Sequence, residues 1–281
     1  MAEINQNISP DINTPLRGKG GKLYVIKIGG NVIDNSENLY YFLQDFAAME
    51  GAKVLIHGGG KIATELAKTL GIESKMVDGR RITDIHTLRV VTMVYAGLIN
   101  KNIVAQLQKG NCNAIGLTGA DANLIRASKR PVKEVDYGYV GDLHATSVAT
   151  NKLSALIEEG LVPVFAPITH DGEGQLLNTN ADTIASNIAV ALSEKYDVSL
   201  VYCFEKKGVL RDITDEESAI PEISSAEFET LKADNIIAGG MLPKLQNAFA
   251  AITTGVKEVY IGKADELKNI NKGSFGTRLF E

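Results

Sequence analysis

Apolar residues occur along the chain in short runs, and a glycine-rich or polar segment ends most of these runs. The first run spans residues 22–28, with the sequence KLYVIKI, and ends at Gly29 and Gly30. A second run at residues 53–56 ends in the sequence HGGG at residues 57–60. Apolar residues at helical spacing follow each glycine segment, over residues 37–50 and from Ile62 to Leu70. Each unit therefore predicts a strand, a tight glycine turn and a helix.

The same alternation continues to the C terminus. Apolar runs predict strands at residues 113–117, 161–168, 198–204 and 256–261, and helical spacing predicts helices over residues 84–109, 146–159, 181–192, 225–232 and 243–252. Residues 123–142 predict one or two short hairpins, and the segment from His170 to Gly174 predicts a hairpin turn. Strands that alternate with helices are typical of a mostly parallel sheet with helices on both faces. The fold class is therefore α/β, and no linker-like stretch divides residues 22–281.

The helix predicted over residues 84–109 is apolar on more than one side. Its apolar positions include Ile85, Leu88 and Val91 on one side, and Val90 and Val94 on another. A helix of this kind lies at the centre of a fold or at a subunit interface. We expect a homodimer for this reason, and we expect Thr83 to be the N-cap of the helix.

The composition of the chain argues against two classes of function, nucleic-acid binding and membrane insertion. The 281-residue chain has a net charge of −5, with 44% hydrophobic and 22% charged residues, which is ordinary for a soluble globular protein. The acidic balance and the lack of a basic run argue against nucleic-acid binding. No apolar stretch looks long enough to span a membrane, and no signal sequence opens the chain. We therefore expect a cytoplasmic protein without a membrane anchor.

Cysteine and histidine spacing does not indicate a metal site. The two cysteines, Cys112 and Cys203, form no CxxC pattern, and the four histidines share no ligand spacing. Residues 1–21 are polar, contain two prolines and end in the sequence GKGG. They predict a flexible amino-terminal arm ahead of the folded domain.

The glycine segments are the first candidates for chemistry. Lys27 ends the first strand, at the edge where open α/β sheets bind their ligands, and Gly29 and Gly30 follow it. Glycine leaves the backbone open to a ligand, and a helix N-terminus presents unpaired N–H groups to an anion. One such motif could be an ordinary turn. Two of them in neighbouring strand–helix units favour a phosphate or carboxylate site.

Three further motifs carry polar groups at helix starts. In NTNAD at 178–182, Asn180 fits an N-cap with Asp182 in the first turn; the motif is either capping chemistry alone or places Asn178 and Asp182 in the same cleft. In GGMLPK at 239–244, Lys244 lies in a first turn, where the helix dipole disfavours a cation, so an anion is expected nearby. Arg81 is either a surface charge or a fork for a carboxylate.

The order and spacing of KIGGNVI, HGGG, GRRIT, NTNAD and GGMLPK resemble the amino-acid kinase superfamily, and within it the N-acetyl-L-glutamate kinase family. The resemblance extends from Leu23 to Thr277. It implies a three-layer αβα sandwich with a mostly parallel central sheet. It also implies two lobes: an N-lobe at about 22–177 that binds the acylated glutamate and a C-lobe at about 178–281 that binds ATP.

The resemblance also implies roles for individual residues. Lys27 and Lys244 match the lysines that stabilise the transferring phosphoryl group, and Asp182 matches the carboxylate that orients them. The positions that match acylglutamate binding are Gly59, Gly60, Arg81 and Asn178. The positions that match nucleotide binding are Gly29, Gly30, Glu205, Lys206, Lys207, Gly208, Val209, Leu210, Ile236, Ile237, Ala238, Gly239 and Gly240. Glu205-Lys206-Lys207 departs from the family, which usually has an aspartate-led and less basic loop there.

The activity that the resemblance implies is ATP-dependent phosphorylation of the γ-carboxylate of N-acetyl-L-glutamate to N-acetyl-L-glutamyl 5-phosphate, in arginine biosynthesis. ATP would be a co-substrate, with Mg²⁺ held mainly by its phosphates. One alternative is N-succinyl-L-glutamate as the acceptor, because some arginine pathways use the succinylated compound. A second alternative is a non-catalytic amino-acid sensor on the same fold.

Overall fold

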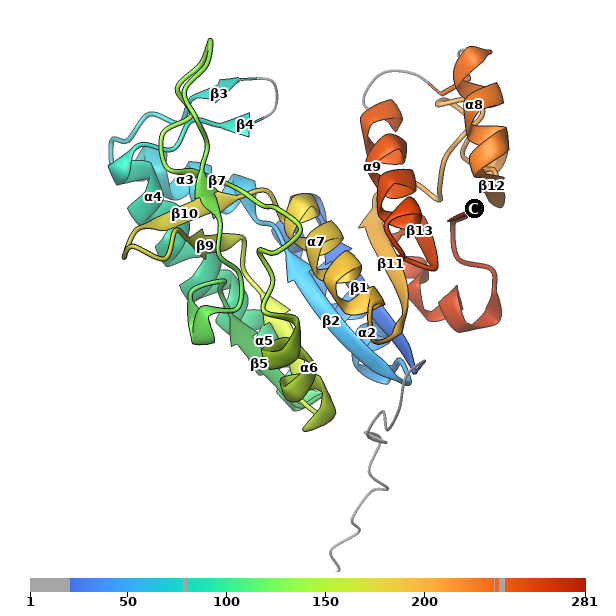
Figure 1. The fold of residues 1–281 in the computed structure, drawn as a ribbon, viewed down its shortest axis with the longest axis horizontal. Coiled ribbons are helices and arrows are strands. Elements are labelled where there is room, and N and C mark those ends of the chain that lie inside the picture. The colour runs from blue at the N-terminus through green and yellow to red at the C-terminus, as the bar shows by residue number, and fades with distance from the viewer. Residues whose placement is uncertain (1–20, 78–79, 235, 238–240) are drawn as a thin grey trace, which may run out of the picture.

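The computed structural model describes residues 21–77, 80–234, 236–237 and 241–281, so all but the last residue of the predicted arm lies outside the described part (Figure 1). Within that part the central sheet has eight strands in the order β12-β14-β13-β11-β1-β2-β8-β5. The strands are β1 (Lys22–Ile28), β2 (Ala52–His57), β5 (Ala114–Leu117), β8 (Val162–Phe165), β11 (Asp197–Phe204), β12 (Glu222–Ser224), β13 (Glu258–Lys263) and β14 (Thr277–Phe280). β13 and β14 pair antiparallel, and the other neighbours pair parallel.

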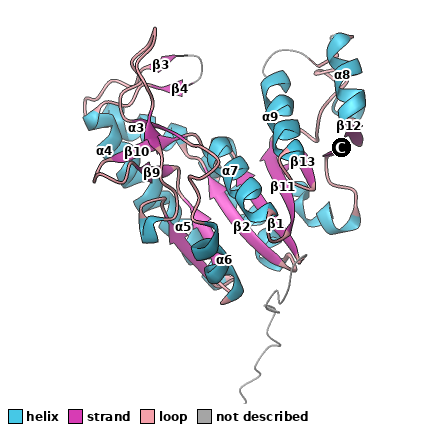
Figure 2. Ribbon diagram, in the orientation of Figure 1, coloured by secondary structure: helices cyan, strands magenta, loops and turns pink. Residues whose placement is uncertain are grey.

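Helices cover both faces of this sheet (Figure 2). The helices of one core are α6 (Thr150–Glu158), α7 (Ala181–Ser193), α8 (Ser225–Ala233) and α9 (Met241–Thr253). The other core contains α2 (Ser36–Ala48), α3 (Gly60–Thr69), α4 (Ile85–Thr92) and α5 (Asn100–Lys109). Strand β1 contributes side chains to both cores. Leu23 and Val25 pack into the first core, and Tyr24, Ile26 and Ile28 pack into the second. This confirms the predicted three-layer α/β fold.

A second, smaller sheet borders the central one. Its strands, in the order β6-β7-β10-β9, are β6 (Ser128–Lys129), β7 (Val140–Asp142), β10 (Leu176–Thr179) and β9 (Ile168–His170). The predicted hairpins at 123–142 and 170–174 belong to this sheet, because β6 pairs with β7 and β9 pairs with β10 in antiparallel fashion. The strand predicted over 161–168 is wrong in one respect: β8 ends at Phe165, and Ile168 begins β9 in the second sheet.

The long helix predicted over residues 84–109 is continuous, but its middle turns, Met93–Ile99, form a π-helix between α4 and α5. Thr83 is not its N-cap. Asp84 has extended backbone angles and accepts a hydrogen bond from the N–H of Thr87 at 2.7 Å, while Thr83 is fully buried and bridges to Gly138. The N-cap is therefore one residue later than predicted.

The same helix, Ile85–Lys109, is long and apolar enough to cross a membrane by length and composition alone, so the prediction that no apolar stretch has this length is wrong. Ile103 and Leu107 are fully buried in the second core, so the helix packs within the fold. The boundaries of one other helix and of the last predicted strand differ by a few residues from the predicted ones. The helix predicted from Thr146 starts at Thr150, and the last predicted strand runs from Glu258 to Lys263.

A short helix, a two-stranded hairpin and a 3₁₀ segment complete the fold. Helix α1 (Gly30–Asp34) follows β1 directly, and the two-stranded hairpin of β3 (Met76–Val77) and β4 (Arg80–Arg81) precedes α4. A 3₁₀ segment, Ala264–Lys272, connects β13 to β14. Since β1, β2 and β11 run parallel, their carboxyl ends meet at one edge of the sheet.

Candidate active site

Lys27 lies near the carboxyl end of the central strand. In the alternation of β1 it points to the same face as Leu23 and Val25, which is the face covered by α7 and α9. Its neighbours across the sheet are Ile56 on β2 and Tyr202 on β11. Only 7% of the residue is exposed, so this lysine is buried at the edge of the sheet.

Asp182 faces this lysine from the first turn of α7. Asn180 is the N-cap, as predicted, and its side chain accepts a hydrogen bond from the N–H of Thr183 at 3.0 Å. The Oδ1 atom of Asp182 lies 2.8 Å from Nζ of Lys27. The two groups form an ion pair between a nearly buried lysine and a partly exposed carboxylate. The cap thus places a carboxylate directly over the lysine.

Lys244 approaches the same place from the first turn of α9. Its Nζ lies 3.9 Å from the centre of the Phe204 ring. The pKa of Lys244 is lowered, chiefly because protein atoms displace water around the ammonium group; Asp182 opposes this shift and Lys27 adds to it. The two lysines and the aspartate predicted to act together therefore influence one another electrostatically.

The first of two adjoining cavities has a volume of about 370 Å³. It is lined by Gly30, Gly58, Gly59, Met76, Arg80, Arg81, Tyr95, Arg130, Val140, Pro167, Asn178, Thr179, Asn180 and Ala181. Three of the four residues predicted to bind the acylglutamate are among them. The fourth, Gly60, begins α3 at the end of the same glycine segment.

Hydroxyl groups hold the guanidinium of Arg81 in this cavity. Its Nη1 donates to Ser74 Oγ at 2.8 Å, and its Nη2 donates to Thr64 Oγ1 at 2.7 Å. Burial raises the pKa of the neighbouring Tyr95 hydroxyl, and Arg81 opposes that shift. Nearby, Asn178 Nδ2 donates to Thr83 Oγ1 at 3.0 Å. Both side chains are thus oriented before any ligand binds.

Gly59 lines this cavity, and its backbone angles, φ +140° and ψ 36°, favour glycine. A Cβ atom at Gly59 would lie 2.2 Å from Cδ1 of Ile99. The loop therefore packs against the π-helix, and the absence of a side chain keeps the N-terminus of α3 open to a ligand.

The second cavity has a volume of about 290 Å³. It is lined by Gly29, Gly30, Asn31, Val32, Cys203, Phe204, Glu205, Lys206, Gly208, Met241, Lys244 and Ile261. Gly30 lines both cavities, so they adjoin at the start of α1. Burial raises the pKa of the Cys203 thiol to about 12, against the effect of Lys27, which keeps this cysteine uncharged.

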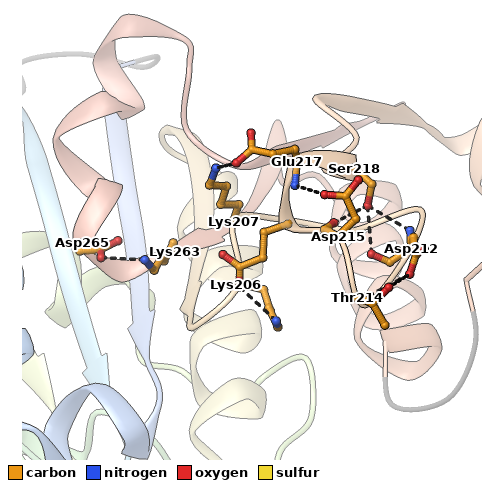
Figure 3. A network of polar contacts seen from close by, with 10 residues as sticks. Lys206, Lys207, Asp212, Thr214, Asp215, Glu217, Ser218, Lys263 and Asp265 are labelled. Atoms are coloured by element: carbon orange, nitrogen blue, oxygen red, sulfur yellow. Dashed lines mark hydrogen bonds and ion pairs between the residues drawn. The ribbon is translucent and has the colours of Figure 1, made fainter.

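The basic loop after β11 is neutralised by its own carboxylates (Figure 3). Lys206 pairs with Glu216 at 3.1 Å, and Lys207 pairs with Glu217. Of the other positions predicted to bind the nucleotide, Val209 is buried in the core and Leu210 bridges to Ala219.

The two isoleucines predicted for the nucleotide site, Ile236 and Ile237, pack against the core on the α7 and α9 face. The remaining predictions there, Ala238, Gly239 and Gly240, lie outside the described residues.

A buried polar network behind the HGGG loop was not predicted. The ring of His57 is fully buried; its Nδ1 lies 2.8 Å from the carbonyl of Gly58, and Asn100 Nδ2 lies 3.1 Å from its Nε2. These partners fit a neutral ring with its proton on Nδ1. Burial lowers the pKa of His57 to about 4. Lys101 completes the network by donating to Asn100 Oδ1 at 3.1 Å and to the carbonyl of Gly116 at 2.9 Å.

No group of three or more His, Cys, Asp or Glu side chains suited to a metal ion occurs among the residues that the structure describes. Around the two cavities the described polar groups are mainly backbone amides, lysines and arginines, with Asp182 beside Lys27 and Glu205 in the lining of the second cavity as carboxylates. This donor set suits anions, and any divalent cation would come with a phosphate ligand.

Comparison with known proteins identifies the family to which the chain belongs. The family model described as "Amino acid kinase family" matches residues 22–263, and the chain belongs to that family. An N-acetylglutamate synthase from Neisseria gonorrhoeae has the same fold, with a TM-score of 0.77 at 21% identity over 94% of this chain and 60% of that one.

Within the family, the chain groups with the acetylglutamate kinases. It is 61% identical over 253 residues to the acetylglutamate kinase of Bacteroides thetaiotaomicron, covering 90% of this chain and 97% of that protein. It is 58% identical over 262 residues to that of Cytophaga hutchinsonii, covering 92% of this chain and 98% of that protein.

Proposed function

We propose that this protein transfers the γ-phosphoryl group of MgATP to the side-chain carboxylate of N-acetyl-L-glutamate, in arginine biosynthesis. The products are N-acetyl-L-glutamyl 5-phosphate and ADP. The observation that carries the proposal is the junction of the two cavities at Gly30, with Lys27, Asp182 and Lys244 beside it. The high identity to acetylglutamate kinases favours the acetyl compound over the succinyl alternative.

The reaction needs charge stabilisation more than proton transfer. A carboxylate oxygen of the acceptor attacks the γ-phosphorus, and the bond from that phosphorus to the bridging oxygen breaks as ADP leaves. The attacking carboxylate is already ionised, so no general base is required. The obstacle is the approach of two anions, which positioning and fixed positive charge overcome. Lys27 and Lys244 supply that charge; Asp182 holds Lys27 through their ion pair and acts on Lys244 only at longer range.

The first cavity is the acceptor site. Arg81 binds the α-carboxylate through its planar fork, which Thr64 and Ser74 already hold. Asn178 donates to Thr83, so its side-chain oxygen accepts the N–H of the acylated nitrogen. Gly59 and Gly60 present backbone N–H groups at the start of α3 to the acceptor.

The second cavity is the nucleotide site. Gly29 and Gly30 approach the phosphates, and Glu205, Lys206 and Gly208 line the side away from the acceptor. The assignment of Lys207, Val209, Leu210, Ile236, Ile237, Ala238, Gly239 and Gly240 to nucleotide binding rests on the family resemblance. Mg²⁺ enters with ATP, bound mainly by its phosphates. The N-lobe, residues 22–177, thus binds the acceptor, and the C-lobe, residues 178–281, binds ATP.

We also propose a homodimer in the cytoplasm. On the long helix, the large apolar side chains of Ile85, Met93 and Leu98 are 37%, 54% and 52% exposed. A second copy would cover them. Mass in solution tests this: we expect twice the 30.2 kDa chain mass for the wild type and a shift toward 30.2 kDa for Leu98→Glu. A wild-type mass of one chain contradicts the dimer.

The activity test combines ADP release with trapping of the acyl phosphate by hydroxylamine. We expect both signals with N-acetyl-L-glutamate and a lower kcat/KM with N-succinyl-L-glutamate. A flat ADP trace with both acceptors, together with ligand binding, would favour the sensor instead. The reverse order of kcat/KM would establish the succinyl compound as the substrate.

Lysine variants test the assignment of roles. Lys27→Met and Lys244→Met keep unbranched side chains but remove the charges, and we expect each to lower kcat by about 100-fold or more. Lys257→Met is the matched control. Lys257 pairs with Asp197 at 2.9 Å at the amino-terminal ends of β13 and β11, which are the strand ends away from the proposed site. Near-wild-type turnover in either site variant contradicts the roles of the lysines.

A further inference from the structure

The ring of Phe204 lies beneath both lysines of the proposed site. Phe204 is the last residue of β11 and packs on the same face of the sheet as Lys27. Its ring centre is 3.9 Å from Nζ of Lys244 and 5.3 Å from Nζ of Lys27. The ring of Tyr202 stacks with it, with a centroid distance of 6.1 Å and an interplanar angle of 18°. Phe204 also lines the cavity assigned to the nucleotide.

Lys244 has little else to hold it. Asp182 contacts Lys27, and among the described residues no carboxylate lies within ion-pair distance of Nζ of Lys244. Lys27 and the N-terminal dipole of α9 both repel a cation at this position. An aromatic face within about 6 Å attracts an ammonium group through its quadrupole. The Phe204 ring is therefore the attractive contact that the structure provides for this ammonium group.

A neutral ring differs from a carboxylate in an important way. A carboxylate beside Lys244 would cancel its charge and compete with the phosphoryl group for it. The π face attracts the ammonium group without neutralising it. The full positive charge then remains available to the developing charge on the phosphoryl oxygens.

We propose that Phe204 is a positioning residue that holds the Lys244 ammonium group beside the junction of the two cavities. The proposal rests on the kinase function proposed above. Lys244 is held in place before ATP binds, so the enzyme does not have to order a long, flexible side chain during the reaction. Loss of the π face should therefore lower kcat more than it changes the KM of the acceptor.

Progressive fluorination of Phe204 tests the contact with little change in shape. Replacing Phe204 with 4-fluoro-, 3,5-difluoro- and 3,4,5-trifluorophenylalanine withdraws density from the π face in steps. We expect log kcat to fall linearly along the series, reaching roughly tenfold for the trifluoro ring, with the acceptor KM within about twofold of wild type. Trifluorination of Phe165, which is fully buried in the same core and has no lysine over its ring among the described residues, is the matched control. No dependence on fluorination at Phe204, or an equal loss at Phe165, overturns the proposal.

A spectroscopic readout separates this proposal from the kinase function. In protein with ¹³C-labelled lysine, the ring current of Phe204 should shift the methylene protons next to Nζ of Lys244 upfield, and Phe204→Leu should abolish the shift. Lys244→Met identifies the resonance. An unshifted Lys244 signal in the wild type overturns the proposal whatever the substrate. An inactive wild type with a shifted signal contradicts the kinase function, but not the contact between the ring and Lys244.

Discussion

Gly59→Ala offers a quantitative test of how the glycine loop is built. The new Cβ atom would lie 2.2 Å from Cδ1 of Ile99, far inside van der Waals contact, while the ring of Tyr95 would be at an ordinary 3.6 Å. The backbone angle φ of +140° is also one that residues with a side chain rarely adopt. Backbone strain of this kind costs about 1–3 kcal/mol. Overpacking adds about 1–3 kcal/mol. The free energy of unfolding should therefore fall by about 2–6 kcal/mol in total.

A double-mutant cycle separates the clash from the strain. Ile99→Val deletes the Cδ1 atom that the new methyl group would meet, and by itself it should cost about 0.5–1.5 kcal/mol. In that background Gly59→Ala retains its backbone strain but loses the clash, so the two substitutions should couple by about 1–3 kcal/mol in the stabilising direction. Gly71→Ala is the control for strain alone, because Gly71 has φ +73° with no atom within 4 Å of its Cβ position.

Urea denaturation at fixed protein concentration measures these free energies, and kcat/KM for N-acetyl-L-glutamate reports on the loop. We expect Gly59→Ala to lower kcat/KM in both backgrounds, since the side chain also crowds the amides at the start of α3. Additive free energies, within about 0.5 kcal/mol, would refute the packing of Gly59 against Ile99. A loss for Gly59→Ala no larger than that for Gly71→Ala would refute it as well.

Three further predictions concern the site. The pKa of His57 is lowered from 6.5 to about 4 in the folded protein, so the unfolded state binds this proton first as pH falls. The stabilisation from the neutral ring is therefore complete above pH 6.5 and is lost as the pH falls to about 4. The difference in unfolding free energy between wild type and His57→Gln should shrink by about 3 kcal/mol between pH 7 and 4, and a constant difference would exclude a neutral buried ring. Arg81→Lys should raise the KM for N-acetyl-L-glutamate about tenfold or more with a smaller effect on kcat, because the bidentate fork is lost; an unchanged KM in steady-state kinetics would exclude that role. Asp182→Asn should lower kcat about tenfold or more, because Lys27 loses its ion-pair partner and the repulsion between the two lysines is no longer offset. An unchanged kcat would show that Asp182 does not orient Lys27.

The predictions that succeeded depend on local chemistry. The continuous apolar run of residues 22–28 predicted the buried strand β1, and the end of that run placed Lys27 at the edge of the sheet where ligands bind. Asn180 is an N-cap because an asparagine precedes a helical pattern with an acidic first turn. At the start of the long helix two capping residues, Thr83 and Asp84, stand side by side. Propensity alone did not distinguish them, and the bridge from Thr83 to Gly138 decided which one caps the helix.

The features that were missed depend on residues far apart in the chain. His57 and Asn100 are 43 positions apart, and only the folded arrangement of β2 against the long helix brings them to hydrogen-bond distance. The π-helix at Met93–Ile99 is a local shift of backbone hydrogen bonds, which residue patterns do not reveal. Yet this shift supplies Tyr95 to the acceptor cavity, and it is followed at once by Asn100. Such π segments are frequent at functional sites.

The balance of charge links these features to the reaction. Asp182 pairs with Lys27, and no described carboxylate lies within ion-pair distance of Lys244, so among the described residues the charge of Lys244 has no directly paired anion. The fold holds this cation with a group that carries no charge, the phenylalanine ring beside Lys244. The histidine behind the HGGG loop is kept neutral by burial and so adds no further positive charge. A further acidic residue would stabilise the free protein more simply, but it would hold the cations more tightly than the ground state requires and weaken their gain in the transition state. The arrangement therefore favours binding of the phosphoryl group over stability of the empty site.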